Sequence, residues 1–417
     1  MAPRSLHRPP CSLTIGGFYI DGVWIRILLY ADDIVFLAED EIILQSMINK
    51  LASYCSVWDL KVNLAKSKIV VFRKRGQLKK AYKWSYNNEN IDVVSGYKYL
   101  GVYLKSSCSY VEHLNNQLSV AKMGLNAVYR NVFYMKTTNL TPFFKVFDAV
   151  SRSIMCYSAQ VWGFSSYNEV ELIQRFFIKK LLWLPYNTPN YMVLLETGRD
   201  PLFLFTLKLH WAYLGHILKL EDVRYPRKLF NFGRENNLKW FSNLKAYADK
   251  YDMWNRFLPL NSCNFNRSIT ELYSLIQIDI RQDLLNQVML AQFHTFYKEI
   301  KLNFGLECYL QSCCTLHEIR FIFRARADML PLNCKLWFPE SNHKCTLCNL
   351  NVDENLFHFI AVCPILKEFR MSFFGFSMLD EVQFIQVLDG LFGWKNLAYY
   401  VKNALNYRSE LIVEFNF

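Results

Sequence analysis

The segment Leu28-Leu29-Tyr30-Ala31-Asp32-Asp33-Ile34-Val35-Phe36-Leu37 places two adjacent carboxylates between two short apolar runs. Each run is rich in Leu, Ile, Val and Phe, which is typical of a β-strand. We therefore expect two paired strands joined by a tight turn, with Asp32 and Asp33 exposed at the rim of a small sheet. Two hard oxygen ligands in this position suit Mg²⁺, which proteins bind through one or two carboxylates together with substrate phosphates. The alternative is a plain acidic turn, since Asp is a common turn residue.

The neighbouring residues extend this sheet. Asp21-Gly22 lies between two apolar stretches and is a strong hairpin signal, so Asp21 is expected to be a turn residue rather than a third metal ligand. Residues 41–57 carry apolar side chains mostly at three- and four-residue steps, which predicts a helix with one buried face that continues to Trp58. Residues 96–104, GYKYLGVYL, are typical of one strand.

A basic run follows the predicted helix. Residues 61–83 hold nine Lys or Arg side chains and no acidic one, and aromatic side chains are interleaved with them. This pattern favours contact with a nucleic-acid backbone, although a run of charge is often only a solvated face. The residues that we expect to bind nucleic acid are Lys61, Lys68, Arg73, Lys74 and Arg75.

These motifs resemble those of a known family. Tyr30-Ala31-Asp32-Asp33 resembles the Tyr-x-Asp-Asp box of reverse transcriptases, and residues 60–72 and Tyr99-Leu100-Gly101 resemble the segments that follow it in non-LTR (LINE-type) retrotransposons. The resemblance runs from about Ile15 to the C-terminal cysteines and is vague between about 200 and 320. It implies an RNA-directed DNA polymerase, a nucleotidyltransferase that uses Mg²⁺ when catalytic and has RNA and DNA as partners.

The same resemblance assigns catalytic roles. Asp32 would be the main metal ligand, with Asp33 assisting. Lys66 would lie near the incoming nucleotide, where a lysine can neutralise phosphate charge or protonate pyrophosphate. The alternative for Lys66 is a solvated loop lysine.

A second constellation lies near the C-terminus, with the pattern C-x2-C-x9-H-x4-C at Cys345, Cys348, His358 and Cys363. Two thiolates two residues apart, followed by a His and a Cys, can complete the tetrahedron that Zn²⁺ prefers. LINE-type proteins often carry such a zinc knuckle. Cys334 and His343 are spare ligand candidates. Arg320, Arg324 and Arg326 just upstream are expected either to extend a basic surface or to be outer-face charges of a helix.

Composition agrees with a large protein that contacts polyanions. The chain has 417 residues, 52% of them hydrophobic, and a net charge of +12, which favours nucleic acid or an anionic membrane surface as partner. Charged residues interrupt every apolar run before it reaches the length of a membrane span, so we expect no membrane contact. Twelve cysteines without a signal peptide indicate reduced thiols and a cytoplasmic or nuclear location.

The predicted fold class is α+β: a partial reverse-transcriptase palm sheet with helices, a mostly helical thumb and connector, and a small zinc-binding element. The expected segments are a disordered leader (1–14), partial palm (15–105), helical thumb (106–200), helical connector (201–335), zinc-knuckle-like element (336–370) and C-terminal helical tail (371–417).

The sequence leaves the activity open. In the family, a further catalytic aspartate and the fingers lie well upstream of the Tyr-x-Asp-Asp box, and only 29 residues precede Tyr30 here. We therefore expect a truncated reverse transcriptase of a LINE-type retrotransposon that is inactive alone. The alternatives are a non-catalytic nucleic-acid-binding protein derived from a retrotransposon, and a decayed reading frame whose product has no role.

Overall fold

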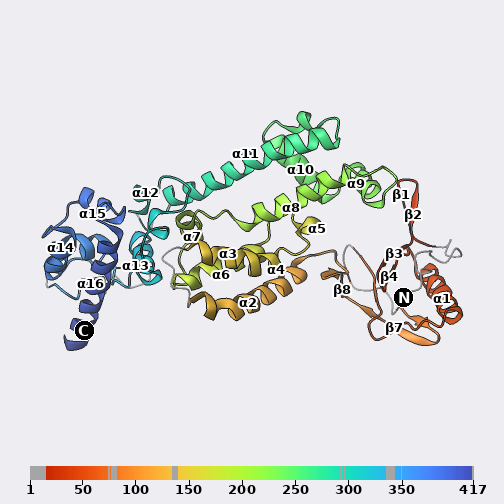
Figure 1. Ribbon diagram of the computed structural model, residues 1–417, viewed down its shortest axis with the longest axis horizontal. Coiled ribbons are helices and arrows are strands. Elements are labelled where there is room, and N and C mark those ends of the chain that lie inside the picture. The colour runs from red at the N-terminus through yellow and green to blue at the C-terminus, as the bar shows by residue number, and fades with distance from the viewer. Residues whose placement is uncertain are drawn as a thin grey trace. The chain divides into compact units, whose positions relative to one another are not determined.

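The computed structural model describes residues 16–73, 76, 82–133, 140–291, 294, 296–334, 343–348 and 350–415 (Figure 1). The described chain is mostly helical with small sheets, which agrees with the predicted mixed class. It forms two compact units that interleave along the sequence. Unit 1 comprises the described residues up to Asn116, Ser158–Ser165 and Thr206–Leu272; unit 2 comprises Gln117–Tyr157, Ser166–Phe205 and the residues from Tyr273 onward. The domain limits expected from the sequence stay predictions.

Unit 1 begins with short antiparallel hairpins. Its strands are β1 (Phe18–Ile20), β2 (Val23–Ile25), β3 (Ile27–Tyr30), β4 (Asp33–Phe36), β5 (Lys68–Val70), β6 (Trp84–Tyr86), β7 (Glu89–Val94), β8 (Gly96–Tyr99) and β9 (Val102–Lys105). The pairs β1–β2, β3–β4 and β8–β9 are two-stranded, and a three-stranded sheet has the order β5-β7-β6, with β5 parallel to β7.

Both predicted hairpins around acidic turns are confirmed. Asp21 and Gly22 have φ of 46° and 76°, which is the left-handed geometry that an Asp-Gly hairpin turn requires. In the second hairpin, Tyr30 pairs with Asp33 and the two-residue turn is Ala31-Asp32, with φ of 50° at Ala31. Asp21 is therefore a turn residue, as expected.

Helix α1 (Glu41–Val57) has the predicted limits. The carboxylate of Asp40 caps its first turn by accepting a hydrogen bond of 2.8 Å from the backbone N–H of Ile43. Met47, Ile48 and Cys55 are buried, but Trp58 is 55% exposed, so the prediction that the buried face includes it is wrong. The reason is that the helix ends at Val57, and the chain leaves the helical path at the residue that follows.

The side of α1 that packs on the sheet is fixed by polar contacts as well as by burial. Ile48, Trp84 and Tyr86 form a small core beneath it. The Gln45 side chain both donates to the carbonyl of Ser85 (2.8 Å) and accepts from its N–H (2.9 Å), so it pairs with β6 as a strand would. These contacts hold α1 and β6 together within unit 1.

The single strand expected at residues 96–104 is wrong, because the structure has two strands there. β8 and β9 pair with each other across a turn at Leu100 and Gly101, whose φ values are 46° and 83°. A left-handed pair of this kind reverses the chain, and Gly101 provides it at little steric cost.

The remaining elements are helical. Unit 1 also contains α5 (Ala159–Trp162), α9 (Tyr225–Glu235), α10 (Lys239–Lys250) and the 3₁₀ turn η3 (Trp254–Phe257). Three longer helices contribute residues to both units: α2 (Val111–Phe133), α8 (Leu202–Ile217) and α11 (Ser262–Met289). None of the helices in the described part of the chain combines the length and apolar character needed to cross a membrane.

Unit 2 contains α3 (Thr141–Phe147), the π-helical turn η2 (Asp148–Arg152), α4 (Ser153–Met155), α6 (Asn168–Leu181), α7 (Asn190–Thr197), α12 (Tyr297–Ile300), η4 (Cys308–Leu310), α13 (Leu316–Arg326), η6 (His358–Val362), η7 (Pro364–Leu366), α14 (Lys367–Phe374), α15 (Glu381–Leu388) and α16 (Trp394–Phe415). Helix α13 packs against α16, and so does α14.

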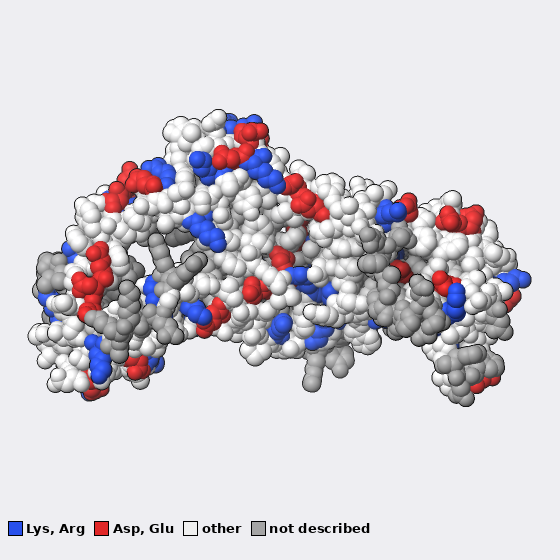
Figure 2. Space-filling model, turned by 180° about the vertical axis from the view of Figure 1, so that it is seen from behind, with Lys and Arg blue, Asp and Glu red and all other residues white. Residues whose placement is uncertain are grey.

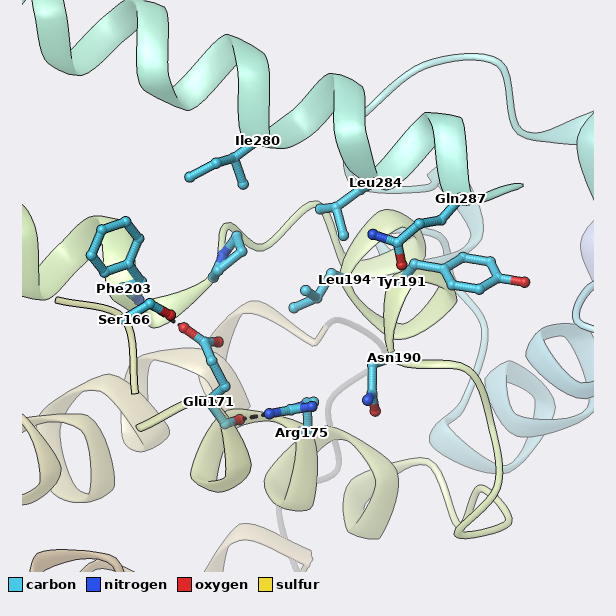
Figure 3. Close-up of a pocket in the computed structure, with 11 residues that line it drawn as sticks. Ser166, Glu171, Arg175, Asn190, Tyr191, Leu194, Phe203, Ile280, Leu284 and Gln287 are labelled. Carbon is cyan, nitrogen blue, oxygen red and sulfur yellow. Dashed lines mark hydrogen bonds between the residues drawn. The ribbon is translucent and has the colours of Figure 1, made fainter. Parts of the chain in front are cut away.

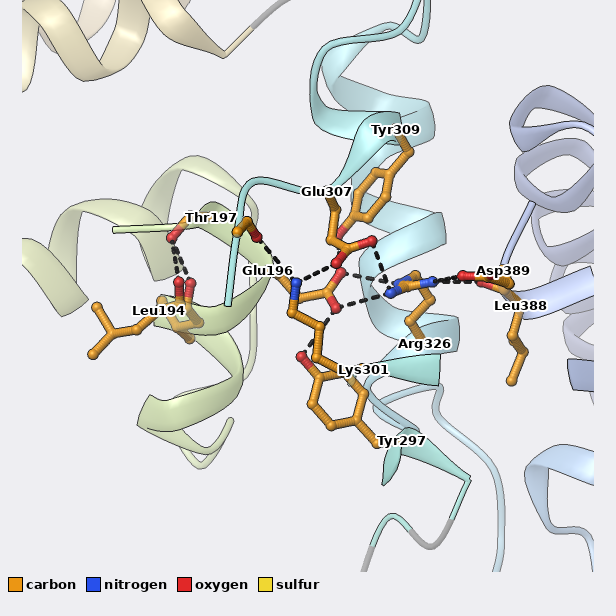
Figure 4. A network of polar contacts seen from close by, with 12 residues as sticks. Leu194, Glu196, Thr197, Tyr297, Lys301, Glu307, Tyr309, Arg326, Leu388 and Asp389 are labelled. Carbon is orange, nitrogen blue, oxygen red and sulfur yellow. Dashed lines mark hydrogen bonds and ion pairs between the residues drawn. The ribbon is translucent and has the colours of Figure 1, made fainter. Parts of the chain in front are cut away.

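A buried ion pair joins several of these elements (Figure 4). Arg326 of α13 and Glu196 of α7 are both fully buried, and Arg326 donates to the Glu196 carboxylate through Nε (3.0 Å) and Nη2 (3.2 Å). The hydroxyls of Tyr297 and Tyr309 donate to the same carboxylate at 2.9 Å and 2.6 Å. The remaining Arg326 donor, Nη1, reaches the carbonyl of Leu388 at 2.7 Å.

Two acidic and two basic side chains of this network lie in the interior, and a third acid, Asp389, lies at its exposed edge. Arg326 also pairs with Glu307 (3.1 Å), which in turn pairs with the buried Lys301, and Arg326 Nη1 lies 3.6 Å from the half-exposed Asp389. Burial alone would raise the pKa of Glu196, but the charge and hydrogen bonds of Arg326 outweigh it and the pKa is lowered. Arg326 and the nearly buried Arg320 are thus neither surface nor outer-face charges, which corrects both expectations for these two residues.

We predict that Arg326→Met destabilises unit 2 by about 3–5 kcal/mol, because it leaves the Glu196 carboxylate buried without a cation. Hydrogen exchange of peptides from α7 and α13 measures this loss locally. Because the pKa of Glu196 is lowered on folding, the stabilisation is present above the normal glutamate range and is lost as pH falls through the lowered value.

The matched control is Arg256→Met, since Arg256 pairs with Glu271 in an ion pair that is half exposed on both sides. That variant should change stability by less than about 1 kcal/mol. Equal losses in the two variants would contradict a special role for the buried pair.

Candidate functional site

The acidic pair lies at the tip of the β3–β4 hairpin. Asp33 closes the strand pairing opposite Tyr30, Asp32 occupies the turn, and all three side chains are exposed. The strand pairing therefore presents two carboxylates to solvent, which is the arrangement that the sequence predicts. Within the described residues, these two carboxylates do not belong to any group of three or more Asp, Glu, His and Cys side chains whose ligand atoms converge.

The β8–β9 hairpin places Tyr99 near the acidic turn. Burial and the negative charge of Asp33 both raise the pKa of Tyr99, the last residue of β8. This electrostatic influence of Asp33 on Tyr99 links the acidic turn to the Tyr-Leu-Gly segment. Asp33 therefore lies close enough to Tyr99 for its charge to act there.

Lys66 lies in a turn whose backbone is well fixed. Its N–H donates to the side chain of Asn63 (3.2 Å), and its carbonyl accepts from the Tyr97 hydroxyl (3.0 Å). The Lys66 side chain is exposed, so it is available to a phosphate. Its role beside a nucleotide stays a prediction.

The predicted nucleic-acid-binding residues differ in their surroundings. Lys61 is exposed, whereas Lys68 pairs with Asp92 at 2.6 Å and Arg73 donates to the carbonyl of Gly76 at 2.6 Å. The predicted contacts of Lys74 and Arg75 lie outside the described residues. Figure 2 shows acidic and basic side chains interspersed on the face that it displays.

The four predicted metal ligands converge. Cys345, Cys348, His358 and Cys363 are all buried, and their ligand atoms lie within 4.8 Å of one another. Cys348 Sγ is 3.5 Å from His358 Nε2, which identifies Nε2 as the nitrogen that faces the thiols. These four residues form a group that could hold a metal ion.

Local structure explains why they meet. The backbone of Cys345 pairs with Val352 (2.9 Å) in a short hairpin, and the Asn355 side chain caps the turn that carries His358 (2.7 Å). The fully buried Arg370 donates to the carbonyl of Cys363 (2.6 Å) and so fixes the fourth residue. Arg370 was not predicted from the sequence, because a basic residue between apolar ones is usually an exposed helix charge.

The buried thiols influence one another's pKa values. A hydrogen bond to Cys363 and burial raise the pKa of Cys345 to about 12. The same hydrogen bond lowers the pKa of Cys363, and burial raises that of Cys348. Mutual hydrogen bonding among buried thiols indicates that they are close enough to share one ion.

The spare candidates Cys334 and His343 do not join this group. They converge instead with Asp353, and the ligand atoms of these three residues also lie within 4.8 Å of one another. Asp353 was not predicted, because an aspartate in a polar hairpin segment is typical of a turn.

Unit 2 also has a cavity of about 280 Å³ between α6, α7 and α11 (Figure 3). Its wall includes Glu171, whose carboxylate accepts backbone hydrogen bonds from Leu202 (3.2 Å) and Phe203 (2.8 Å) at the start of α8. Burial raises the pKa of Glu171 despite these bonds. Glu171 therefore has a structural task as a helix cap.

Two comparisons with known proteins bear on the function. Residues 16–104 match the family model described as reverse transcriptase (RNA-dependent DNA polymerase). The chain is also 22% identical over 208 residues to an uncharacterized transposon-derived protein of Caenorhabditis elegans, an alignment that covers 48% of this chain and 73% of that protein. Together they support a retrotransposon reverse transcriptase, and a segment of this kind implies nucleic-acid binding.

Proposed function

We propose that this chain is part of a LINE-type retrotransposon reverse transcriptase and that it holds nucleic acid against the β3–β4 hairpin. The observation that carries the proposal is the position of Asp32 and Asp33 at the exposed tip of the β3–β4 hairpin, inside the segment that matches the reverse transcriptase family. In this proposal the two carboxylates hold Mg²⁺, and Lys66 contacts the phosphates of a nucleotide.

The proposed nucleotidyl transfer depends on the charges of Asp32, Asp33 and Lys66. In nucleotidyl transfer, Mg²⁺ would stabilise the negative charge that develops on the transferred phosphoryl group. Asp32 and Asp33 supply the oxygen ligands, and their place on paired strands limits their movement. Lys66, with its backbone fixed by Asn63 and Tyr97, would bring a positive charge to the leaving phosphate.

A non-catalytic role in nucleic-acid binding is the second candidate. Two-metal transfer commonly uses a further carboxylate, and among the described residues no third converging acidic, His or Cys ligand joins Asp32 and Asp33. This observation favours a polypeptide that binds nucleic acid without extending a primer by itself.

The polypeptide Met1–Phe417 should therefore show no template-dependent primer extension with Mg²⁺ or Mn²⁺. Incorporation of labelled nucleotide on an RNA template with a DNA primer measures this directly. Template-dependent incorporation that disappears in Asp32→Asn would show instead that the acidic pair is active in this chain.

Binding to nucleic acid should be electrostatic and largely independent of sequence. Log K should fall linearly with log salt, with a slope set by the number of phosphates neutralised. The double variant Lys61→Ala/Lys66→Ala should flatten the slope by about 1–2, and the triple variant at Arg73, Lys74 and Arg75 should flatten it as well.

Lys298→Ala is the control, because Lys298 is also exposed but belongs to unit 2. Its slope should equal that of the wild type. Unchanged slopes in the double and triple variants would show that residues 61–83 are only a solvated face.

We further propose that Cys345, Cys348, His358 and Cys363 bind Zn²⁺. Three thiolates and an imidazole are a ligand set that structural zinc sites use, and burial of all four residues fits a closed site without a water ligand. Because cysteine binds as thiolate, the affinity should fall as pH drops.

Cys345→Ser should lose this zinc ion and loosen residues from about 343 to 366, since metal supplies much of the folding free energy of short segments of this kind. Metal analysis together with hydrogen exchange tests both effects, and Cys313→Ser, at an exposed cysteine, is the control. Full retention of the ion in Cys345→Ser would mean that the ligand set is wrong.

A further inference from the structure

A second group of metal-ligating side chains lies outside the four-residue site. Cys334, His343 and Asp353 each offer one ligand atom, and these atoms lie within 4.8 Å of one another. Cys334 and His343 are partly buried, and Asp353 is exposed. The three residues come from three separate stretches, so sequence proximity alone does not explain their convergence.

A backbone ladder brings them together. Cys334 N–H donates to the carbonyl of Glu354 (3.2 Å), and Glu354 N–H donates to the carbonyl of His343 (2.7 Å). Lys344 and Asp353 form a β-bridge in the same hairpin. Glu354 is thus the residue on which the two other stretches meet, and Asp353 directly precedes it.

Glu354 itself is firmly held. Its side chain is fully buried and pairs with Arg408 of α16, whose Nη2 lies 2.7 Å from the carboxylate. The backbone N–H of Asn333 donates to the same carboxylate at 2.9 Å, and the Asn333 side chain accepts from Arg408. Asn333, which precedes Cys334, and Glu354, which follows Asp353, are therefore held together by one ion pair whose carboxylate is fully buried.

We propose that Cys334, His343 and Asp353 form a second metal site, which binds Zn²⁺ with solvent in the fourth position. A thiolate, an imidazole and a carboxylate are all zinc ligands, and three protein ligands with one open position are typical of sites that keep a water. The partial exposure of the group leaves room for that water.

The geometry distinguishes this site from a catalytic thiol relay. In a Cys-His-Asp relay the imidazole lies between the sulfur and the carboxylate, and each ring nitrogen contacts one of them. Here the sulfur and the carboxylate oxygen also lie within 4.8 Å of each other, so the three atoms converge on a common point. Convergence on one point is what a metal ion requires.

The charges of the three side chains also suit Zn²⁺. One thiolate and one carboxylate balance the charge of Zn²⁺, whereas the site with three thiolates carries a net negative charge when it is filled. Lys344 Nζ binds Asp353 Oδ1 at 2.9 Å, which leaves the other carboxylate oxygen for the metal. The hairpin that carries Cys345 and Cys348 therefore contributes to both proposed sites.

Zinc content of the full chain tests the proposal. After gel filtration in a reducing buffer that contains Zn²⁺, the wild type should retain two zinc ions per chain, and Cys334→Ser and Asp353→Ala should each retain one. The control Cys313→Ser should retain two. The proposal would be overturned if the wild type retained one zinc ion and Cys334→Ser retained it too. It would also be overturned if Cys334→Ser or Asp353→Ala retained two zinc ions.

Co²⁺ substitution shows which ion is lost. In Cys334→Ser, the remaining Co²⁺ should keep the strong sulfur-to-metal absorption of the three-thiolate site, which also proves that the variant folds there. Loss of that absorption with the second ion retained would contradict the assignment. This readout separates failure of the second site from failure of the Cys345 site, which would remove the strong absorption from the wild type itself.

Alkylation tests the alternative that Cys334 is a nucleophile in a thiol relay with His343. Zn²⁺ should slow the reaction of Cys334 with iodoacetamide in the full chain while Cys313, followed by peptide mass spectrometry, reacts at the same rate as before. Rapid alkylation of Cys334 that depends on His343 and is unaffected by Zn²⁺ would indicate a thiol relay and overturn the metal site.

Discussion

The buried pair of Arg326 and Glu196 is the interaction on which unit 2 depends. Neither side chain has any contact with solvent, so each charge is tolerated only because the other is present. Through the hydroxyls of Tyr297 and Tyr309 and the carbonyl of Leu388, this one pair connects α7, α12, η4, α13 and α15. The same principle recurs near the Cys345 group, where the fully buried Glu354 pairs with Arg408 and so fixes the hairpin that carries Cys345 and Cys348 to α16.

In unit 1 the constraint is strand pairing rather than buried charge. The β3–β4 hairpin exposes several apolar side chains, among them Leu29 (49%) and Tyr30 (62%), so burial contributes little to the position of the acidic turn. Four cross-strand residue pairs, from Ile27 with Phe36 to Tyr30 with Asp33, set the register instead. This register determines that Asp32 and Asp33 lie together at the tip, where the proposed chemistry needs them.

The sequence predicted those features that depend on local signals. The Asp-Gly turn, the limits of α1 and the Cys-Cys-His-Cys group each follow from short-range spacing, and the structure has all three. Features that depend on tertiary contacts were missed: Arg326 was expected outside because an isolated arginine gives no sign of a distant glutamate. Asp353 was missed for the same reason, since its neighbours Cys334 and His343 reach it only through pairing with Glu354. The turn at Leu100 and Gly101 also has a local signal, the glycine, but the apolar residues on both sides of it are typical of one continuous strand.

Photo-crosslinking tests most directly whether nucleic acid lies along the segment of the acidic hairpin. The full chain would be irradiated with an RNA–DNA primer–template that carries a photoreactive base at the primer end, and the linked peptides would be identified by mass spectrometry. We predict crosslinks in residues 60–73 and at the β8–β9 turn, which follows Tyr99, the residue on which the charge of Asp33 acts. Crosslinks confined to unit 2, or none at all under low-salt conditions, would contradict it.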